Sequence, residues 1–428
     1  MQKTWRFPGL SGKSAGMKAR HLLPALLCLT LPAHSQEWAR FLGTNGTATG
    51  TAPGLPSVIQ DSDYAWKTDL PGTGVSSPVA WENKIFMTAE LPESGHRALL
   101  CYDLQSGKEL WRQEDTFQPH GKHRFNSFAS SSPAADKDRV YLAWTSAGTM
   151  KAMAVSHAGK KLWETDLGPY SEEHGSGSSP VLAGNRIIVS TDCEKGSGGI
   201  LAINPDDGST LWKTPRSSDR TPFSTPLTYE ETPGKWRIVV SSNPAALTCF
   251  DAADGKVLWQ VDNPSPGLRA VGSPAKCGDI IFAAIGQGGT AKASVAVRLK
   301  EGSANRVWEG KKAMPYVPTP VALGDHFIFM NDGGILSSVQ ASDGTVKWSE
   351  RLFQDQAYST PVLTGDRIVC VSRSGNVAIT EASSSSFKLL GTTQLGEPCD
   401  STPAVAGGRL IIRTAKRLLC IPGAKIQP

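Results

Sequence analysis

The chain has 428 residues, with 43 glycines, 29 prolines and 12 tryptophans, and only 19% of its residues are charged. So much glycine and proline with so little charge predicts many short strands joined by turns, and argues against a helical protein. The formal net charge is +5, but residues 1–35 carry five basic residues and no acid, which leaves 39 basic residues against 39 acidic ones. This balance excludes a general electrostatic footprint for nucleic acid or anionic lipid.

Residues 1–35 are predicted to be a secretory signal peptide. Basic residues precede an apolar run at 22–31, which is about ten residues long and too short to span a bilayer, since spanning takes about 20. Small residues at positions −3 and −1 fit cleavage between Ser35 and Gln36. We therefore expect an exported protein, periplasmic or extracellular, with no transmembrane segment.

A Ser/Thr-Pro step recurs eight times along the rest of the chain. Its copies are Ser77-Pro78, Ser132-Pro133, Ser179-Pro180, Thr225-Pro226, Ser273-Pro274, Thr319-Pro320, Thr360-Pro361 and Thr402-Pro403. A short apolar run follows each copy, for example residues 186–189 and 409–412. The mean interval of about 46 residues accommodates four short strands with their turns, which is the content of one propeller blade.

A second landmark closes most units: a turn rich in aspartate and glycine, an apolar residue and a tryptophan. We predict that these tryptophans pack each blade against the next, burying about 150–250 Å² each. The set is Trp66, Trp111, Trp163, Trp212, Trp259, Trp308 and Trp348. Because the last unit lacks an outer strand and residues 63–70 read like the other tryptophan strands, the N-terminal strand is predicted to close the ring.

The predicted fold class is thus all-β, an eight-bladed β-propeller of four-stranded antiparallel blades. Residues 63–428 form the propeller, and residues 36–62 are a lead-in segment before it. Aspartates in the turns are interpreted as bonding to the turn backbone rather than as a set of functional carboxylates. These residues are Asp103, Asp207, Asp251, Asp254 and Asp343.

The units resemble the tryptophan-docking repeats of the pyrroloquinoline-quinone (PQQ) propeller superfamily. The nearest copies of its Ala-x-Asp-x-x-x-Gly-Lys-x-x-Trp pattern are residues 102–111 and 250–259. The resemblance covers about residues 63–428 and implies the propeller fold. The superfamily holds quinoprotein dehydrogenases as well as BamB-like non-enzymatic exported propellers, so the resemblance alone leaves the activity open.

The resembled dehydrogenases cover PQQ with a pair of adjacent cysteines and hold Ca²⁺ beside it. This chain has no adjacent cysteines and no CxxCH haem motif. We therefore expect a non-catalytic binding or protein-interaction scaffold of the cell envelope, without a cofactor. It would be a monomer with a protein or envelope component as partner and would not bind nucleic acid. The alternatives are a PQQ-dependent quinoprotein dehydrogenase with Ca²⁺, or another exported enzyme acting at the propeller mouth.

The residues just before each proline enter the innermost strands, so their loops should converge on one mouth of the axial channel. Unlike the repeated core, these positions differ from blade to blade, and their arginine and tyrosine content is typical of a recognition surface. They are Arg124, Asn126, His174, Arg220, Phe223, Arg269, Tyr316, Tyr358 and Asp400. The hypothesis is that they bind the ligand or partner; the alternative is that they only fill the channel with hydrogen bonds.

The remaining candidates receive structural interpretations, and no metal site or catalytic residue is predicted. His120 and His123, with His174 one blade further on, lack the further ligands that a metal site needs. Asp192 and Glu194 are expected in a solvated loop. Cysteines at equivalent positions of different blades should lie too far apart for a disulfide, which needs Cα atoms within about 7 Å. These cysteines are Cys101, Cys249 and Cys420.

Overall fold

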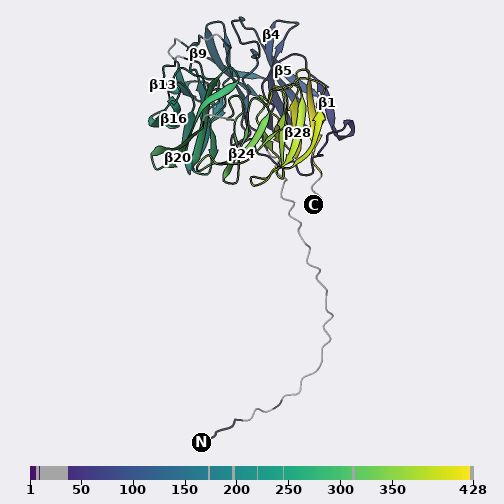
Figure 1. The fold of residues 1–428 in the computed structure, drawn as a ribbon, viewed down its shortest axis with the longest axis vertical. Coiled ribbons are helices and arrows are strands. Elements are labelled where there is room, and N and C mark those ends of the chain that lie inside the picture. The colour runs from purple at the N-terminus through teal and green to yellow at the C-terminus, as the bar shows by residue number, and fades with distance from the viewer. Residues whose placement is uncertain are drawn as a thin grey trace. The chain divides into compact units, whose positions relative to one another are not determined.

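The apolar runs of the repeat form the strands of eight separate four-stranded sheets in the computed structural model (Figure 1). The structure describes residues 1–5, 9, 37–171, 174–194, 198–218, 220–243, 245–310 and 314–424. The predicted signal peptide, apart from residues 1–5 and 9, and its cleavage site lie outside the described residues. Across the described ranges no helix has the length and hydropathy needed to cross a membrane.

Each of blades 1 to 7 consists of four consecutive antiparallel strands, the first innermost and the fourth outermost. The strands of blades 1 to 4 are β2 (Val79–Trp81), β3 (Lys84–Leu91), β4 (His96–Asp103), β5 (Glu109–Asp115), β6 (Ala134–Ala135), β7 (Arg139–Ser146), β8 (Thr149–Ser156), β9 (Lys161–Pro169), β10 (Val181–Leu182), β11 (Ile187–Ser190), β12 (Gly199–Ile203), β13 (Thr210–Pro215), β14 (Leu227–Thr232), β15 (Lys235–Val240), β16 (Ala245–Asp251) and β17 (Val257–Asp262). Those of blades 5 to 7 are β18 (Ala275–Cys277), β19 (Ile280–Gln287), β20 (Thr290–Lys300), β21 (Ser303–Gly310), β22 (Val321–Leu323), β23 (His326–Met330), β24 (Ile335–Gln340), β25 (Val346–Arg351), β26 (Val362–Leu363), β27 (Arg367–Val371), β28 (Asn376–Glu381) and β29 (Leu389–Gln394).

Blade 8 takes strands from both ends of the propeller, as predicted. Its strands are β30 (Ala404–Ala406), β31 (Arg409–Arg413), β32 (Arg417–Pro422) and β1 (Trp66–Asp69), which follows the short 3₁₀ helix η1 (Asp61–Asp63). In β1, Trp66 lies opposite Cys420 and Asp69 lies opposite Arg417. The predicted fold class and the closure of the ring by an N-terminal strand are therefore confirmed.

A ring of hydrogen bonds joins the eight Ser/Thr-Pro steps. In every blade the backbone N–H of the Ser or Thr donates to the hydroxyl oxygen of its counterpart in the next blade. The acceptors, in order from Ser77, are Ser132 at 2.9 Å, Ser179 at 2.9 Å, Thr225 at 3.1 Å, Ser273 at 3.0 Å, Thr319 at 3.1 Å, Thr360 at 3.0 Å, Thr402 at 3.0 Å and again Ser77 at 3.0 Å. This ring explains why a Ser or Thr precedes each proline.

At the outer strands the tryptophans reach into the turn of the next blade. The indole N–H donates to a turn carbonyl oxygen, as Trp66 does to Leu104 at 3.1 Å, and the ring lies against the turn glycine, here Gly107 with φ +69°. The same indole bonds join Trp111 to His157, Trp163 to Pro205, Trp212 to Ala252 and Trp308 to Ala341. A side chain on the turn glycine would collide with the indole, which is why glycine recurs there.

Two tryptophans depart from this pattern. Trp348 packs against Phe387 of the degenerate seventh blade, with ring centroids 5.5 Å apart, and its indole N–H has no partner among the described residues. Trp259 belongs to the apolar cluster between blades 4 and 5. The corresponding turn of blade 5 lies between the long strands β20 and β21, and its Gly302 has no atom within 4 Å of an added Cβ. Docking therefore varies where the repeat is least regular.

The core consists of apolar clusters in which the sheets pack on one another, so the middle strands are buried on both faces. All seven described cysteines are buried and free. Cys101, Cys249 and Cys420 lie opposite docking tryptophans in their sheets, which confirms that the three positions are equivalent. The aspartates of the turns accept local backbone N–H bonds, as predicted; Asp103, for example, accepts from Ser106 at 2.7 Å.

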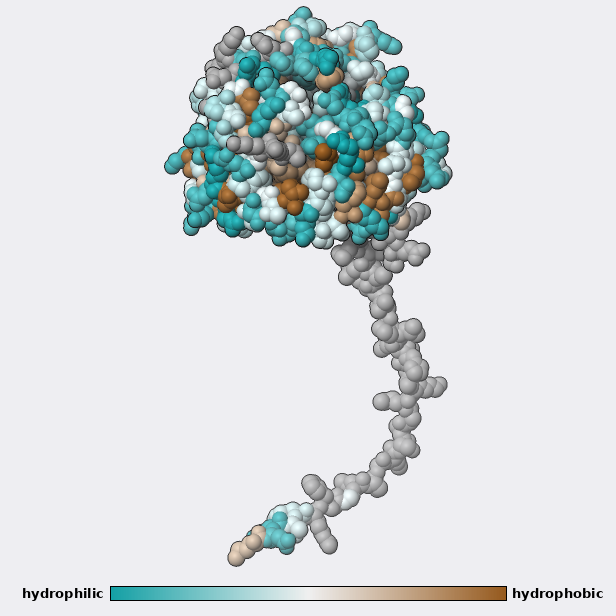
Figure 2. All heavy atoms as spheres, in the orientation of Figure 1, coloured by the Kyte–Doolittle hydropathy of each residue, from teal (hydrophilic) through white to brown (hydrophobic). Residues whose placement is uncertain are grey.

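The outer strands alternate between packed and exposed side chains. Figure 2 shows that apolar side chains on the visible face lie singly or in small groups among hydrophilic ones. The large apolar side chains that are exposed on the outer strands of the whole ring are Leu110, Leu162, Leu211, Val257, Val307, Val346 and Leu389. They stand one or two positions before the docking tryptophan or, for Leu389, two positions before Gly391, which holds the tryptophan's place in the register of blade 7. Their exposure therefore follows from the repeat pattern.

The lead-in segment, described from residue 37, crosses the ends of the innermost strands. Trp38, Ala39, Arg40 and the 48–50 stretch contact four different blades. The partners are Ala80 of β2, Ala135 of β6, Thr228 of β14 and Leu363 of β26. Because these strands stand on different sides of the ring, the segment spans the axis and blocks one end of the channel. Nothing in the sequence had indicated this role.

The hydrogen-bond ring makes a prediction about Ser179. Replacing Ser179 by alanine removes the acceptor of the buried Ser132 N–H and should lower the free energy of unfolding by about 1–3 kcal/mol. The Ser179→Thr variant keeps the hydroxyl, as in the four blades that carry threonine, and should retain stability. Melting temperatures by circular dichroism would check this, with the exposed Ser62→Ala as control. Equal loss in the alanine and threonine variants would contradict the ring's contribution.

The closure of blade 8 makes a second prediction. The Trp66→Ala variant should lose about 3 kcal/mol or more, because it removes an aromatic side chain that joins blade 8 to blade 1. The matched variant is Trp259→Ala, whose indole makes no such turn bond among the described residues, and its loss should be smaller. Thermal melting of the two variants would decide, and a larger loss at Trp259 would be inconsistent with this account.

Candidate functional site

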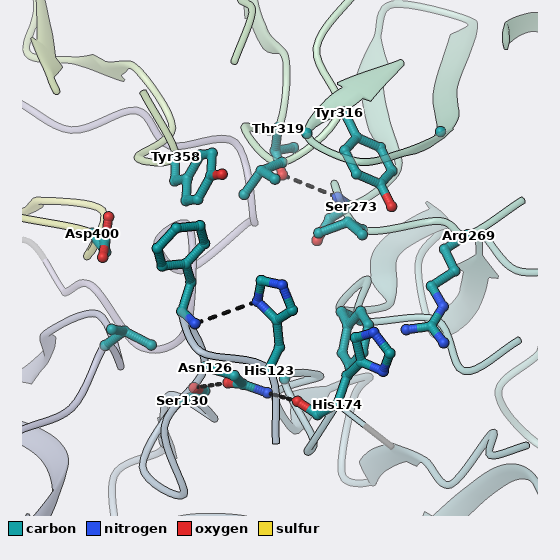
Figure 3. A pocket seen from close by; sticks show the side chains of 18 of the residues that line it. His123, Asn126, Ser130, His174, Arg269, Ser273, Tyr316, Thr319, Tyr358 and Asp400 are labelled. Atoms are coloured by element: carbon teal, nitrogen blue, oxygen red, sulfur yellow. Dashed lines mark hydrogen bonds between the residues drawn. The ribbon is translucent and has the colours of Figure 1, made fainter. Parts of the chain in front are cut away.

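A cavity of about 690 Å³ opens on the ring axis (Figure 3). All nine residues predicted for the channel mouth line it. The eight Ser and Thr of the hydrogen-bond ring line it as well, and so does Phe41 of the lead-in segment. Since the lead-in segment spans the axis, the cavity is a cup with its floor at the ring. The structure thus brings the predicted residues together, while their role in binding stays a prediction.

One wall of the cup is a stack built around an arginine absent from the prediction. The guanidinium carbon of Arg373 lies 3.9 Å from the ring centre of Phe125 and 4.4 Å from that of Tyr358. Its Nε and Nη2 donate to the two oxygens of Asp400 at 2.7 and 3.2 Å. Arg124 lies on Phe125, 4.5 Å from the ring centre. Arg373 comes from the β27–β28 turn rather than from a loop before a proline, so the rule used for the prediction could not find it.

Two histidines face each other at a second part of the rim. The rings of His123 and His174 are parallel, with centroids 5.6 Å apart and planes within 2°. Hydrogen bonds hold this pair together. The backbone N–H of His123 donates to the His174 carbonyl oxygen at 3.0 Å, and Asn126 Nδ2 donates to the same oxygen at 2.7 Å (Figure 3).

His120 lies apart from that pair, in contact with Thr145 at 2.9 Å. The H-x₂-H spacing therefore does not assemble a set of ligands. In the part of the chain that the structure describes, no group of three or more His, Cys, Asp or Glu could hold a metal ion.

The wall opposite the stack rests on buried ion pairs. Arg269 lies 5.7 Å from the ring centre of Phe223 and donates to Glu194 at 2.5 Å. Asp192 pairs with Arg216 at 3.3 Å. The prediction of a solvated loop for the two acids is wrong, since their exposed fractions are 3% for Asp192 and 6% for Glu194.

Asp192 and Glu194 are buried because the chain after β11 folds inward, where Glu194 forms a β-bridge with Ser218 of the next connection. There the positive charges of Arg216 and Arg269 offset the cost of burying the two carboxylates. Burial raises the pKa of Asp192, and the charge of Arg216 opposes that rise.

A buried aspartate holds the loop that brings Tyr316 to the cavity. Asp332 is 3% exposed and accepts the backbone N–H groups of Tyr316 at 2.8 Å and Val317 at 3.1 Å. Burial raises its pKa to about 7, although the two N–H bonds act in the opposite direction. No ion pair is formed by this carboxylate within the described residues. The sequence offered no signal for this residue, which follows a strand like many others.

The Asp332 carboxyl group predicts a pH dependence. Its folded pKa of about 7 lies above the ordinary 3.8, so the folded state holds the proton more tightly, and stability should fall as pH rises from about 4 to 7. The Asp332→Asn variant cannot ionise and should lack that decline. The difference in melting temperature, variant minus wild type, should therefore increase over this range.

A matched control for this experiment is Asp343→Asn, since hydrogen bonds from Thr345 lower the pKa of the exposed Asp343. The opposite sign follows, because Asp343 contributes stability above its ordinary pKa and loses it as pH falls. Melting curves between pH 3 and 8 would show both effects. Parallel curves for wild type and Asp332→Asn would contradict the role of Asp332.

The family follows from comparison with known proteins. A model described as outer membrane protein assembly factor BamB matches residues 58–226 and 226–422. The chain belongs to this family. BamB of Yersinia pestis is 22% identical over 253 residues, which cover 54% of this chain and 61% of that relative. The match thus spans less than two thirds of the relative's length.

Solved structures share the fold. BamB of Moraxella catarrhalis superposes with a TM-score of 0.61 at 13% identity and covers 83% of this chain and 98% of its own. A quinohemoprotein alcohol dehydrogenase of Comamonas testosteroni reaches a TM-score of 0.67 at 10% identity, with 92% and 82% covered. At such identities the likeness shows the propeller and does not separate a binding protein from an enzyme.

Proposed function

We propose that this family member is an exported, non-catalytic propeller of the cell envelope that binds a protein partner at its axial cup. The observation that carries the proposal is the cup itself: nine blade-specific side chains, three of them arginines and two of them tyrosines, converge on one opening. Such a composition is typical of the centre of a protein interface. Family membership supports the proposal, because the matching model is that of an assembly factor.

The chemistry of the lining favours binding over catalysis. Of the described residues that line the cup, Asp400 is the only carboxylate, and both of its oxygens bind Arg373. A carboxylate that acts as a general base must be free to take a proton from the substrate, and Asp400 is held by its arginine. The two imidazoles that line the cup, those of His123 and His174, are stacked on each other. The ring hydroxyls accept backbone N–H bonds, and within the described part of the chain none of them has a carboxylate or imidazole as hydrogen-bond partner.

The same donor set does not fit PQQ with Ca²⁺. Calcium takes six to eight oxygen ligands, usually with several carboxylates. Here the single lining carboxylate is held by an arginine, and no adjacent cysteines exist to cover a quinone. The quinoprotein alternative therefore lacks its ligands among the described residues, although the fold is shared with such enzymes.

Capture from envelope extract tests the proposal. The mature protein should retain a partner that the Tyr358→Ala and Phe223→Ala variants lose, because both side chains line the cup. The control is Leu110→Ala on the outer strand, where the side chain is exposed and away from the axis. Loss of capture in the control alone, with both cup variants unaffected, would move the binding site to the outer surface.

A parallel titration with PQQ and Ca²⁺, followed by absorbance and dye reduction with alcohols, addresses the enzyme alternative. We expect neither stoichiometric uptake of PQQ nor dye reduction. Uptake together with reduction would replace the proposed function by a dehydrogenase activity.

A further inference from the structure

The charges of the cup are not balanced. Among the described lining residues, three arginines, Arg124, Arg220 and Arg269, stand against the single acid Asp400. No lysine and no glutamate is among the described lining residues. The excess of cationic groups indicates an anionic ligand, and arginine, with its planar fork of donors, binds carboxylates in pairs of bonds.

The structure divides the arginines into two kinds. Arg269 is neutralised by Glu194, and Arg373 behind the wall is neutralised by Asp400, so both serve the architecture. Arg124 and Arg220 are exposed, and neither has a carboxylate partner among the described residues. They come from the connections entering blades 2 and 4. These two guanidinium groups are therefore the ones available to a ligand.

Aromatic side chains line the cup together with both arginines. Arg124 stacks on Phe125, which fixes the guanidinium plane and leaves its edge free to donate. Arg220 is three residues before Phe223, and both side chains line the cup. A ligand that meets both groups needs carboxylates together with an apolar portion.

The floor of the cup adds hydrogen-bond donors. Each ring hydroxyl oxygen accepts a backbone N–H, as Thr319 does from Ser273 at 3.1 Å, which leaves the hydroxyl hydrogen to donate (Figure 3). Because the eight ring hydroxyls line the cavity, an oxygen-rich anion would find donors at the floor as well as at the rim.

We propose that the cup receives an acidic peptide segment of the partner, with its Asp or Glu carboxylates bound to Arg124 and Arg220 and an apolar side chain against Phe125 or Phe223. This rests on the proposed function and specifies the chemistry of its partner. Arginine and aromatic residues, with no lysine or glutamate among the described lining residues, are the composition of a protein-binding centre, which favours a peptide over an acidic oligosaccharide.

The test measures fluorescence anisotropy with two labelled peptides, Gly-Glu-Phe-Glu-Gly and its glutamine counterpart Gly-Gln-Phe-Gln-Gly. Wild type should bind the glutamate peptide at least about tenfold more tightly, since hydrogen bonds to charged groups are worth more than neutral ones. The preference should weaken as salt is raised. Arg124→Gln and Arg220→Gln should each reduce it, and the double variant should abolish it.

The control is Arg112→Gln on the outer strand β5, where Arg112 pairs with Glu109 at 2.6 Å away from the cup. Its peptide preference should equal that of wild type. Melting temperatures of the cup variants should be unchanged, because neither arginine holds another described side chain by an ion pair.

Equal affinity for the two peptides, or a preference that survives in the double variant, would overturn the inference. So would binding of oligogalacturonate, an acidic oligosaccharide, with no binding of either peptide. These failures are distinguishable from failure of the proposed function, because capture sensitive to Tyr358 and Phe223 could persist without any preference for acid. Dye reduction with PQQ would instead remove the proposed function itself.

Discussion

The closed ring of eight backbone-to-hydroxyl hydrogen bonds is the interaction on which the rest of this propeller depends. At each step a proline without an N–H follows a Ser or Thr, so the N–H of that Ser or Thr is the donor available for the next blade. The ring sets the distance of every inner strand from the axis. It therefore also sets the size of the opening into which the preceding loops project.

The outer edge of the ring is held by a different device. Tryptophans clamp the turn of the next blade with an indole hydrogen bond and stacking on a glycine, and where blades 5 and 7 change their turns the clamp changes too. The inner ring, by contrast, is complete in all eight blades. The tryptophan contacts at the periphery thus vary from blade to blade, whereas the hydrogen bonds near the axis do not. Loss of one of those bonds would leave a backbone N–H buried and unpaired.

Ion pairing distinguishes the arginines that stabilise the cup from those that are available to bind a ligand in it. Glu194 and Asp400 neutralise Arg269 and Arg373, and removing either acid would leave a partly buried guanidinium without its partner. Arg124 and Arg220 form no ion pair with an acid among the described residues. The blades of a repetitive fold thus come to differ in function, because some of their arginines are paired with acids of the propeller and others are not.

The sequence by itself determined the number of blades, their strand content, the closure by residues 63–70 and the loops that meet at the mouth, because each is written in a local pattern repeated at a steady interval. Tertiary structure decided the rest. The path of the lead-in segment, the stack of Arg373 between Phe125 and Tyr358, and the burial of Glu194 against Arg269 join residues from different blades. No local period specifies such contacts, because they exist only once the ring has brought distant loops to a common axis.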